Sequence, residues 1–310
     1  MSWCAHMSEP RRASLAHRAE YVLFTSAVAV SALIGDRASA AFGEALGKIG
    51  YFPLRFRHEI VQKNLRLAFP EKDDAWIRAT MRAAYAHLGR EALATIRLGR
   101  MTRDQVIDRT RVIGLADFKA KLAEGHGLVL ASGHVGNHEI GAAALSARGI
   151  PLDLVVQQQG NPLFDEALNA TRRRLGLGII DRFQAQRLAI KALRSGRAVA
   201  FAADQNAGKT GLFVPFFGRL ASTHRGAALF AIKTDAPLFL GTSLRKGRGY
   251  EVTLEHIEVD RSGSLDDVVY RLTAAFTARL EQVVRGAPDQ YLWLHRRWKT
   301  APPPEPKTPK

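Results

Sequence analysis

Short, largely apolar runs alternate with helix-like stretches along the chain from about residue 110. Runs of this kind are typical of strands that are buried on both faces, and here they cover residues 127–131, 152–156, 198–203 and 237–244. Stretches of helical character lie between them, at residues 141–147, 162–175, 185–194 and 225–234. This alternation predicts an α/β fold, in which a central, mostly parallel sheet is flanked by helices.

Other patterns predict three further elements. Residues 250–257 alternate between apolar and polar side chains, which indicates an edge or antiparallel strand. Ser264 precedes two acidic residues, as at the start of a helix, so we expect a helix from there to about residue 285. Residues 75–100 repeat apolar positions at a spacing near 3.6, which predicts one long amphipathic helix or two.

An uncharged apolar run at residues 21–35 follows a basic N-terminal stretch. As a helix it would reach roughly 22 Å, which is short of a hydrocarbon core of about 30 Å. A signal peptide is one interpretation, because Ala-Ser-Ala at residues 38–40 resembles a cleavage site. Residues 38–56 remain apolar and carry scattered basic residues, which favours a retained helix that lies on or dips into the bilayer.

These patterns divide the chain into four parts. Residues 1–18 form a basic N-terminal tail, and residues 19–108 form a helical, membrane-associated region. The α/β domain covers residues 109–300. Residues 301–310 are expected to be a disordered tail, because Pro and Lys dominate from residue 302 onwards.

The charge balance predicts an anionic partner. The 310 residues include 45 Lys and Arg against 29 Asp and Glu, a formal net charge of +16. Such a surface attracts anionic lipid, an acidic protein or nucleic acid, although a basic soluble protein without such a partner is the simplest alternative. Nucleic acid is not favoured, because no zinc-finger spacing, RNP-type motif or basic zipper occurs.

Cysteine usage agrees with a reducing compartment. Cys4 is the only cysteine, so no disulfide can form within the chain. Met7 is an alternative start, and a chain that began there would contain no cysteine. A cytosolic environment fits this composition without being required by it.

Candidate chemistry gathers directly after the first buried strand, in the segment SGHVGNHE at residues 132–139. Sites of open α/β sheets lie at the carboxyl ends of their strands. A histidine beside a carboxylate is the minimal general-base pair, and Gly133 and Gly136 would let a substrate approach the backbone. His134 and Glu139 are five residues apart, about 140° on a regular helix, so we expect His134 in a loop and the helix to begin near Asn137.

Metal chemistry is a competing interpretation of the same segment. His134 and His138 are four residues apart, which is a zinc-ligand spacing on a helix. The zincin pattern, however, needs Glu where Val135 stands, and the inverted pattern needs Glu where Asn137 stands. Gly-x-Ser-x-Gly, Walker and Rossmann glycine patterns are missing from the sequence, which argues against a serine hydrolase and obvious nucleotide chemistry.

The histidine segment resembles the lysophospholipid acyltransferase superfamily, and further blocks resemble its late lipid A acyltransferases, the lauroyl and myristoyl transferases of Gram-negative bacteria. Together the blocks extend the likeness over roughly residues 20–300. In chain order they are NPLFD at 161–165 with Arg172 and Arg174, Asp204-Gln205, VPFFG at 214–218 with Thr223, and QYLWLHRRWK at 290–299. The set in this order is far more specific than the histidine segment alone.

The resemblance implies a reaction and its residues. His134 would act as general base with Glu139 as its partner, and an acyl group would pass from acyl carrier protein to a hydroxyl of a lipid A precursor. The acidic carrier protein agrees with the positive charge. No cofactor or metal is implied, and the location would be the cytoplasmic face of the inner membrane. The residues expected to contact substrate are Asn137, Asn161, Arg172, Arg174, Asp204, Gln205, Thr223 and Arg297.

Physical reasoning narrows several of these roles. Arg172 and Arg174 would diverge by about 200° on one helix, so we expect only one of them to face the site and contact phosphate. Asp204 could orient an arginine or cap a loop. Thr223 is expected to cap a helix that starts near His224. Packing is expected of Phe216 and Phe217, whereas packing and lipid-headgroup contact remain open for Trp293, Arg296, Arg297 and Trp298.

The chain also departs from the family pattern. Gln157 stands where the family has an arginine just before the Asn-Pro block, and His138 stands where a tryptophan is usual. The first change raises the alternative of a phospholipid or other glycolipid acceptor. A basic membrane-binding protein without catalysis and a zinc hydrolase are the remaining alternatives.

Overall fold

The computed structural model describes residues 13–303, and of residues 27, 28 and 30–33 only the backbone. The helices are α1 (Leu15–Leu33), α2 (Gly35–Tyr51), α3 (His58–Ala68), α4 (Asp74–Leu98), α5 (Arg103–Asp108), α6 (Leu115–Ala123), α7 (His138–Ala147), α8 (Pro162–Arg174), α9 (Ala185–Arg194), α10 (Gly226–Thr234) and α11 (Leu265–Gly286). The strands are β1 (Thr110–Ile113), β2 (Leu128–Gly136), β3 (Leu152–Val156), β4 (Gly178–Asp181), β5 (Ala198–Ala202), β6 (Leu212–Phe216), β7 (Arg219–Thr223), β8 (Leu238–Lys246) and β9 (Gly249–His256). Short 3-10 turns cover η1 (Gly208–Thr210) and η2 (Pro288–Gln290).

A seven-stranded, mostly parallel sheet organises the fold, in the order β1-β9-β8-β2-β5-β3-β4. Only β8 and β9 pair antiparallel within it. The predicted α/β class and every predicted strand are therefore confirmed. Of the two alternatives predicted for residues 250–257, the antiparallel strand is confirmed, because β9 pairs antiparallel with β8. β9 is not at the edge, because the unpredicted strand β1 pairs parallel with its other side. β4 and the separate β6–β7 hairpin were also not predicted from the sequence.

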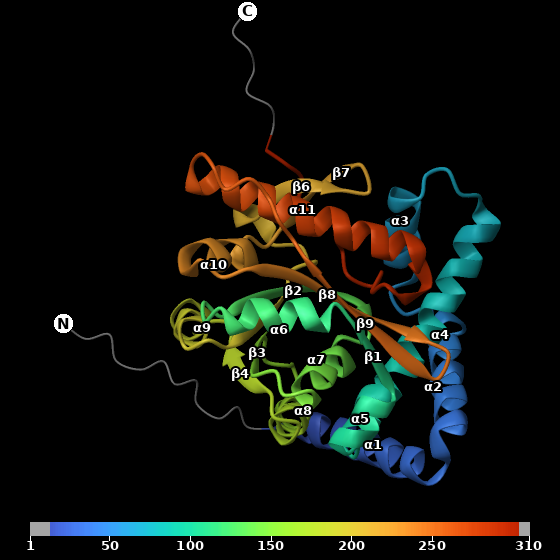
Figure 1. The fold of residues 1–310 in the computed structure, drawn as a ribbon. Coiled ribbons are helices and arrows are strands. Elements are labelled where there is room, and N and C mark those ends of the chain that lie inside the picture. The colour runs from blue at the N-terminus through green and yellow to red at the C-terminus, as the bar shows by residue number, and fades with distance from the viewer. Residues whose placement is uncertain (1–12, 304–310) are drawn as a thin grey trace, which may run out of the picture.

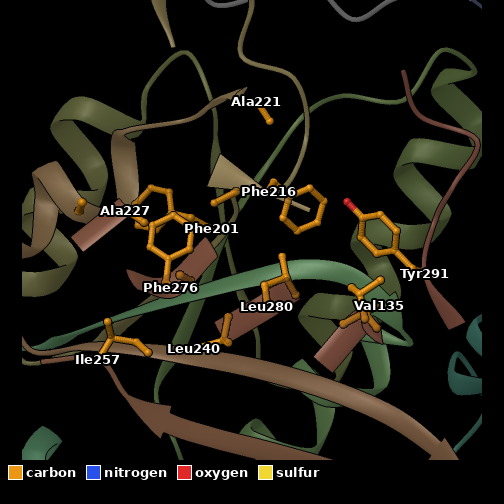
Figure 2. Packing of buried hydrophobic residues seen from close by; sticks show 14 of the residues in the cluster. Val135, Phe201, Phe216, Ala221, Ala227, Leu240, Ile257, Phe276, Leu280 and Tyr291 are labelled. Atoms are coloured by element: carbon orange, nitrogen blue, oxygen red, sulfur yellow. The ribbon is translucent and has the colours of Figure 1, made fainter. Parts of the chain in front are cut away.

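Helices cover both faces of this sheet (Figure 1). Side chains of α9, α10 and α11 share one core cluster with Val129 and Ala131 of β2, whereas α6 and α7 share another with Leu128 and Leu130. The alternation along one strand thus feeds two cores, as expected for a strand buried on both faces. Figure 2 shows Leu280 of α11 within the first core.

The N-terminal helices form a layer beside the sheet. Residues 74–98 are one long helix, α4, which Asp73 caps by accepting a hydrogen bond from the Trp76 N–H at 2.7 Å. α2 packs closely on α4 through small residues: a Cβ on Gly47 would lie 1.9 Å from the carbonyl oxygen of Tyr85. Among the helices of residues 13–303, none combines the length and the apolar character needed to cross a membrane.

The apolar run at residues 21–35 lies mostly in α1, which begins earlier than that run and ends at Leu33. Apolar side chains extend from α2 into solvent at Phe42, Leu46 and Ile49, and the loop after α2 exposes Phe52, Leu54 and Phe56. Phe52 and Leu54 are each 70% exposed. Cys4, Met7 and most of the expected disordered tail lie outside the described residues.

Candidate active site

His134 lies near the carboxyl end of β2, where the pairing between β2 and β8 becomes irregular between Ser132 and Gly136. We expected a loop at this position, but the chain stays in the sheet as far as Gly136 before it turns. α7 begins at His138, next to the expected start, and the Asn137 side chain caps it by accepting a hydrogen bond from the Ile140 N–H at 3.1 Å.

The two glycines beside His134 are required by protein packing. Gly136 has φ +62°, and a Cβ there would lie 1.9 Å from the Ser243 carbonyl oxygen. A Cβ on Gly133 would lie 2.7 Å from the Leu280 side chain. We expected these glycines to admit substrate, but β8 and α11 occupy the space above them. Glycine is therefore needed at both positions so that the backbone around His134 can pack against β8 and α11.

Asp204, at the end of β5, is the carboxylate that binds His134. Its Oδ1 lies 2.7 Å from His134 Nδ1, and its Oδ2 accepts the His134 backbone N–H at 2.8 Å. Adjacent parallel strands β2 and β5 place both residues at the same edge of the sheet. The opposite ring nitrogen, Nε2, lies 3.3 Å from the side-chain nitrogen of Gln205. Asp204 thereby fixes Nδ1 as the protonated nitrogen and leaves Nε2 free to accept a proton.

Electrostatics couple the two groups. Burial alone would lower the pKa of His134, but the adjacent Asp204 carboxylate outweighs burial and raises it. Burial would raise the pKa of Asp204, yet the imidazole, the two hydrogen bonds and Arg297 hold it well below its usual range. Asp204 therefore stays ionised and stabilises the imidazolium that forms when His134 takes a proton.

Glu139 has a different partner from the one that the sequence indicated. Arg172 binds both of its oxygens, with Nε 3.1 Å from Oε2 and a second, shorter contact from Nη2 to Oε1. Burial would raise the pKa of Glu139, but this ion pair lowers it. We expected Glu139 to orient His134 directly; because it lies on the first turn of α7, it faces α8, and Asp204 takes that position.

His138 connects these two groups. Its ring meets the His134 ring edge-on at 5.1 Å between centroids, and its Nε2 lies 3.6 Å from Glu139 Oε1. Burial lowers the pKa of His138. His134 and His138 are therefore neighbours, but no group of three His, Cys, Asp or Glu side chains within residues 13–303 is arranged to hold a metal ion.

A buried polar network around Glu91 supports the turn from behind, and sequence reasoning missed it. Glu91 of α4 accepts hydrogen bonds from Asn137 Nδ2 at 3.0 Å and from the Tyr250 hydroxyl at 2.7 Å. Arg245 of β8 pairs with the same carboxylate. Asn137, which was expected to contact substrate, caps α7 and joins it to α4, and it also lines the first of the two cavities described below. The sequence did not distinguish Glu91 from the other polar positions of α4, which shows an ordinary amphipathic pattern. Its burial is visible only in the structure.

Arg174 and Asn161, also expected to contact substrate, form hydrogen bonds within the protein. Arg174 donates to the carbonyls of Leu98 and Met101, so the expected divergence of Arg172 and Arg174 is confirmed. Asn161 caps α8 and donates to the His17 carbonyl at 2.9 Å.

The expectation for Thr223 is wrong, because α10 starts at Gly226 without a side-chain cap. Thr223 ends β7, and its hydroxyl accepts from buried Arg297 at 2.5 Å. Arg297 also donates to the Ser222 carbonyl at 2.6 Å, so it braces β7 beside Asp204.

The C-terminal block packs inside the protein. Phe216 and Phe217 are buried as expected, and Trp293, only 2% exposed, packs edge-on against Phe217, so packing rather than headgroup contact applies to it. The backbone of this block also supports the site, because the Leu292 N–H donates to the His134 carbonyl at 3.0 Å.

Two cavities meet at His134, His138, Glu139 and Arg172. The first, of about 680 Å³, is mainly apolar and is lined by α1, α4 and α8, including Phe24, Leu88, Phe164 and Ala167. The second, of about 640 Å³, includes Gln157, Arg182, Ala185 and Gln205 in its lining. A group that enters from either side reaches the same imidazole.

Comparison with known proteins gives one consistent result. The family model described as bacterial lipid A biosynthesis acyltransferase matches residues 10–300. The chain is 30% identical over 265 residues to the lipid A biosynthesis lauroyltransferase of Escherichia coli, covering 84% of this chain and 85% of that protein. It is 27% identical over 264 residues to the palmitoleoyltransferase of the same organism, covering 84% of each chain.

A more distant relative is the phosphatidylinositol mannoside acyltransferase of Mycolicibacterium smegmatis, 26% identical over 229 residues and covering 73% of each chain. A family model matching nearly the whole length, together with the first relative, settles the assignment. The chain belongs to the bacterial lipid A biosynthesis acyltransferases and is an acyltransferase.

Proposed function

We propose that the protein transfers a fatty acyl group from acyl carrier protein to a hydroxyl of a lipid A precursor, with His134 as general base. The observation that carries this proposal is the contact between His134 Nδ1 and Asp204 Oδ1 at 2.7 Å, at the point where two cavities meet. The family's names supply the acceptor, and the charge of +16 supports an acidic donor protein.

The proton and the acyl group move in a simple order. His134 Nε2 takes the proton of the acceptor hydroxyl as its oxygen attacks the thioester carbonyl carbon. The carbon–sulfur bond then breaks, and the leaving thiolate takes the proton back from the imidazolium. Asp204 holds the imidazole in the required tautomer throughout. We assign stabilisation of the developing oxyanion to the Gln205 amide, because its nitrogen already lies 3.3 Å from Nε2.

In this proposal Glu139 and Arg172 act together as positioning residues. Their buried ion pair ties the first turn of α7 to α8 directly behind the two histidines. Glu139 also helps to raise the pKa of His134 from a distance. The Arg172 guanidinium therefore binds the Glu139 carboxylate, so we do not assign it to a phosphate of the acceptor. The guanidinium that we assign to acceptor phosphate is Arg100, an exposed side chain in the lining of the first cavity.

The first cavity suits the apolar chains of the acceptor. It has α1 as one wall, and α1 exposes Val22 and Leu23 on its outer side. The neighbouring surface formed by Phe42, Leu46, Ile49, Phe52, Leu54 and Phe56 is apolar and exposed, and Arg55 lies within it. Such a surface favours contact with a bilayer containing anionic lipid, so we place the protein on the cytoplasmic face of the inner membrane.

The second candidate is a different glycolipid or phospholipid acceptor. Gln157 replaces the arginine that is usual in the family, and one relative is named for phosphatidylinositol mannoside. In the structure, however, Arg182 donates to Gln157 Oε1 at 2.9 Å, so a guanidinium from the end of β4 stands at this position.

Intact-lipid mass spectrometry of a strain that lacks the protein tests the proposal. Lipid A should lose the mass of one fatty acyl chain, and the wild-type gene should restore it. A gene encoding Lys119→Ala, an exposed change on α6, should restore it equally and serves as the control. Unchanged lipid A together with a lost acyl chain on a phospholipid would select the second candidate instead.

A further inference from the structure

α9 carries an outward basic face with no acidic residue in the whole helix. Arg187, Lys191 and Arg194 are exposed and lie at positions i, i+4 and i+7, so they align within one face. Ala189 and Leu193 on the opposite face are buried against the sheet. We call Arg187, Lys191 and Arg194 the α9 basic face.

These three charges differ from several other basic residues on the same side of the sheet. Four residues on and around α10 and α11 are neutralised by carboxylates, in the pairs Arg225–Asp266, Arg261–Asp235, Arg279–Glu255 and Arg285–Glu281. Within residues 13–303, no carboxylate forms a salt bridge with any residue of the α9 basic face. Unpaired like charges on one rigid helix face produce a local positive potential that attracts an anionic partner.

The α9 basic face also adjoins an entrance to the site. Ala185, at the first turn of α9, and Arg182, just before it, both line the second cavity, which reaches His134. Phe183 between them is 81% exposed, and the Arg182 guanidinium stacks 4.6 Å from the centre of its ring. A basic helix face with one exposed aromatic ring beside a cavity is suited to a protein that delivers a reactive group into that cavity.

The position of α9 decides between a protein and a membrane as the partner. Most of the exposed large apolar residues are on α1, α2 and the loop after α2, whereas Phe183 is the one beside α9. Figure 1 shows α9 on the opposite side of the molecule from α2. The outward face of α9 contains no large apolar residue that could enter a bilayer. A protein seated on lipid through α2 would therefore present α9 to the aqueous side.

We propose that the α9 basic face is the docking site for the acidic carrier protein, and that the second cavity receives the acyl thioester. This proposal rests on the proposed function, and it adds a direction: acceptor lipid enters from the side of α1, and the donor enters from the side of α9. Arg182, which lines the second cavity, adds a further positive charge at this entrance.

The test reverses charge at this face in the full-length protein. Arg187→Glu/Lys191→Glu should weaken binding of acyl carrier protein by about tenfold or more at low salt, raise KM for the acylated carrier and leave kcat unchanged. The matched control is Arg111→Glu/Lys119→Glu, which reverses two exposed charges on β1 and α6 and should leave carrier binding near the wild-type value. Binding to vesicles that contain phosphatidylglycerol should be equal for both variants.

Two results would overturn the docking assignment. Equal weakening by both variants would show that only net charge matters, and loss of vesicle binding with intact carrier binding would make α9 a membrane surface. These outcomes differ from failure of the proposed function. In that case the wild-type protein would not bind the acylated carrier and would not transfer its acyl group. Thermal unfolding of each variant checks that the exposed substitutions leave the fold intact.

Discussion

Replacing Asp204 with Asn should remove most of the activity while it preserves the fold. Asp204 is buried and accepts two hydrogen bonds from His134, at 2.7 and 2.8 Å. An amide of the same shape offers its NH₂ group to Nδ1, which moves the ring proton to Nε2 and blocks the nitrogen that must accept the substrate proton. General-base catalysis contributes about 10²–10⁴-fold, so the loss in kcat should correspond to about 3–5 kcal/mol of transition-state stabilisation.

The pH dependence of kcat/KM is a second test of the same variant. The Asp204 carboxylate raises the pKa of His134 above its ordinary 6.5, so wild-type kcat/KM should rise with pH through a value above 6.5 as the imidazole loses its proton. In Asp204→Asn this rise should move to lower pH, because the carboxylate that favours the imidazolium is gone.

The assay is acyl transfer from acylated carrier protein to a lipid A precursor between about pH 5 and 9, a span that brackets the ordinary histidine pKa. Each variant is first checked by thermal unfolding. Asp117→Asn, an exchange of the same kind at an exposed position in the first turn of α6 and outside both cavities, is the control and should keep the wild-type rate and profile. Near-normal kcat and an unshifted profile in Asp204→Asn would refute the reasoning.

Three further predictions concern stability and substrate fit. Glu139→Ala should destabilise the fold by about 3–5 kcal/mol in urea unfolding, because it leaves Arg172 buried without its carboxylate, and adding Arg172→Met should recover part of that loss; an effect below 1 kcal/mol would contradict the buried pair. Glu91→Ala should lower the free energy of unfolding by a similar amount in the same measurement. Glu44→Ala, the control, breaks more exposed ion pairs and should lower it by about 0–1 kcal/mol, and equal losses in the two variants would be evidence against the network. Ala167→Phe should raise KM for the acceptor about tenfold in steady-state assays, because a ring in the first cavity displaces about two methylenes of acyl chain, and an unchanged acceptor KM would move the acceptor chains elsewhere.

The alternating pattern was sufficient to predict the sheet. Residues 198–202 are continuously apolar, and residues 152–156 are apolar except for Asp153, because helices cover both faces of the sheet. The local pattern therefore reflects how the strands are buried in the fold. β1 and β4 have only four residues each and mix polar with apolar positions at the margins of the sheet. Their pairing depends on neighbours that are distant in sequence, and no local signal marks it.

For a similar reason, the sequence predicted the catalytic histidine but not the residues that hold it in place. A motif within eight residues identified His134, and sequence proximity pointed to Glu139 as its partner. Asp204 is 70 residues further along the chain and reaches His134 only because β5 pairs with β2. Glu91 could not be recognised either, because its role depends on contacts with β8 and β9.

The reaction of the purified protein with acylated carrier protein and a lipid A precursor tests the central claim most directly. Mass spectrometry of the products should show the acceptor enlarged by one fatty acyl group with wild-type protein, and the rate should fall by at least about 10² with folded His134→Ala. His134→Ala that transfers the acyl group as fast as wild type would contradict the assignment of His134 as the base.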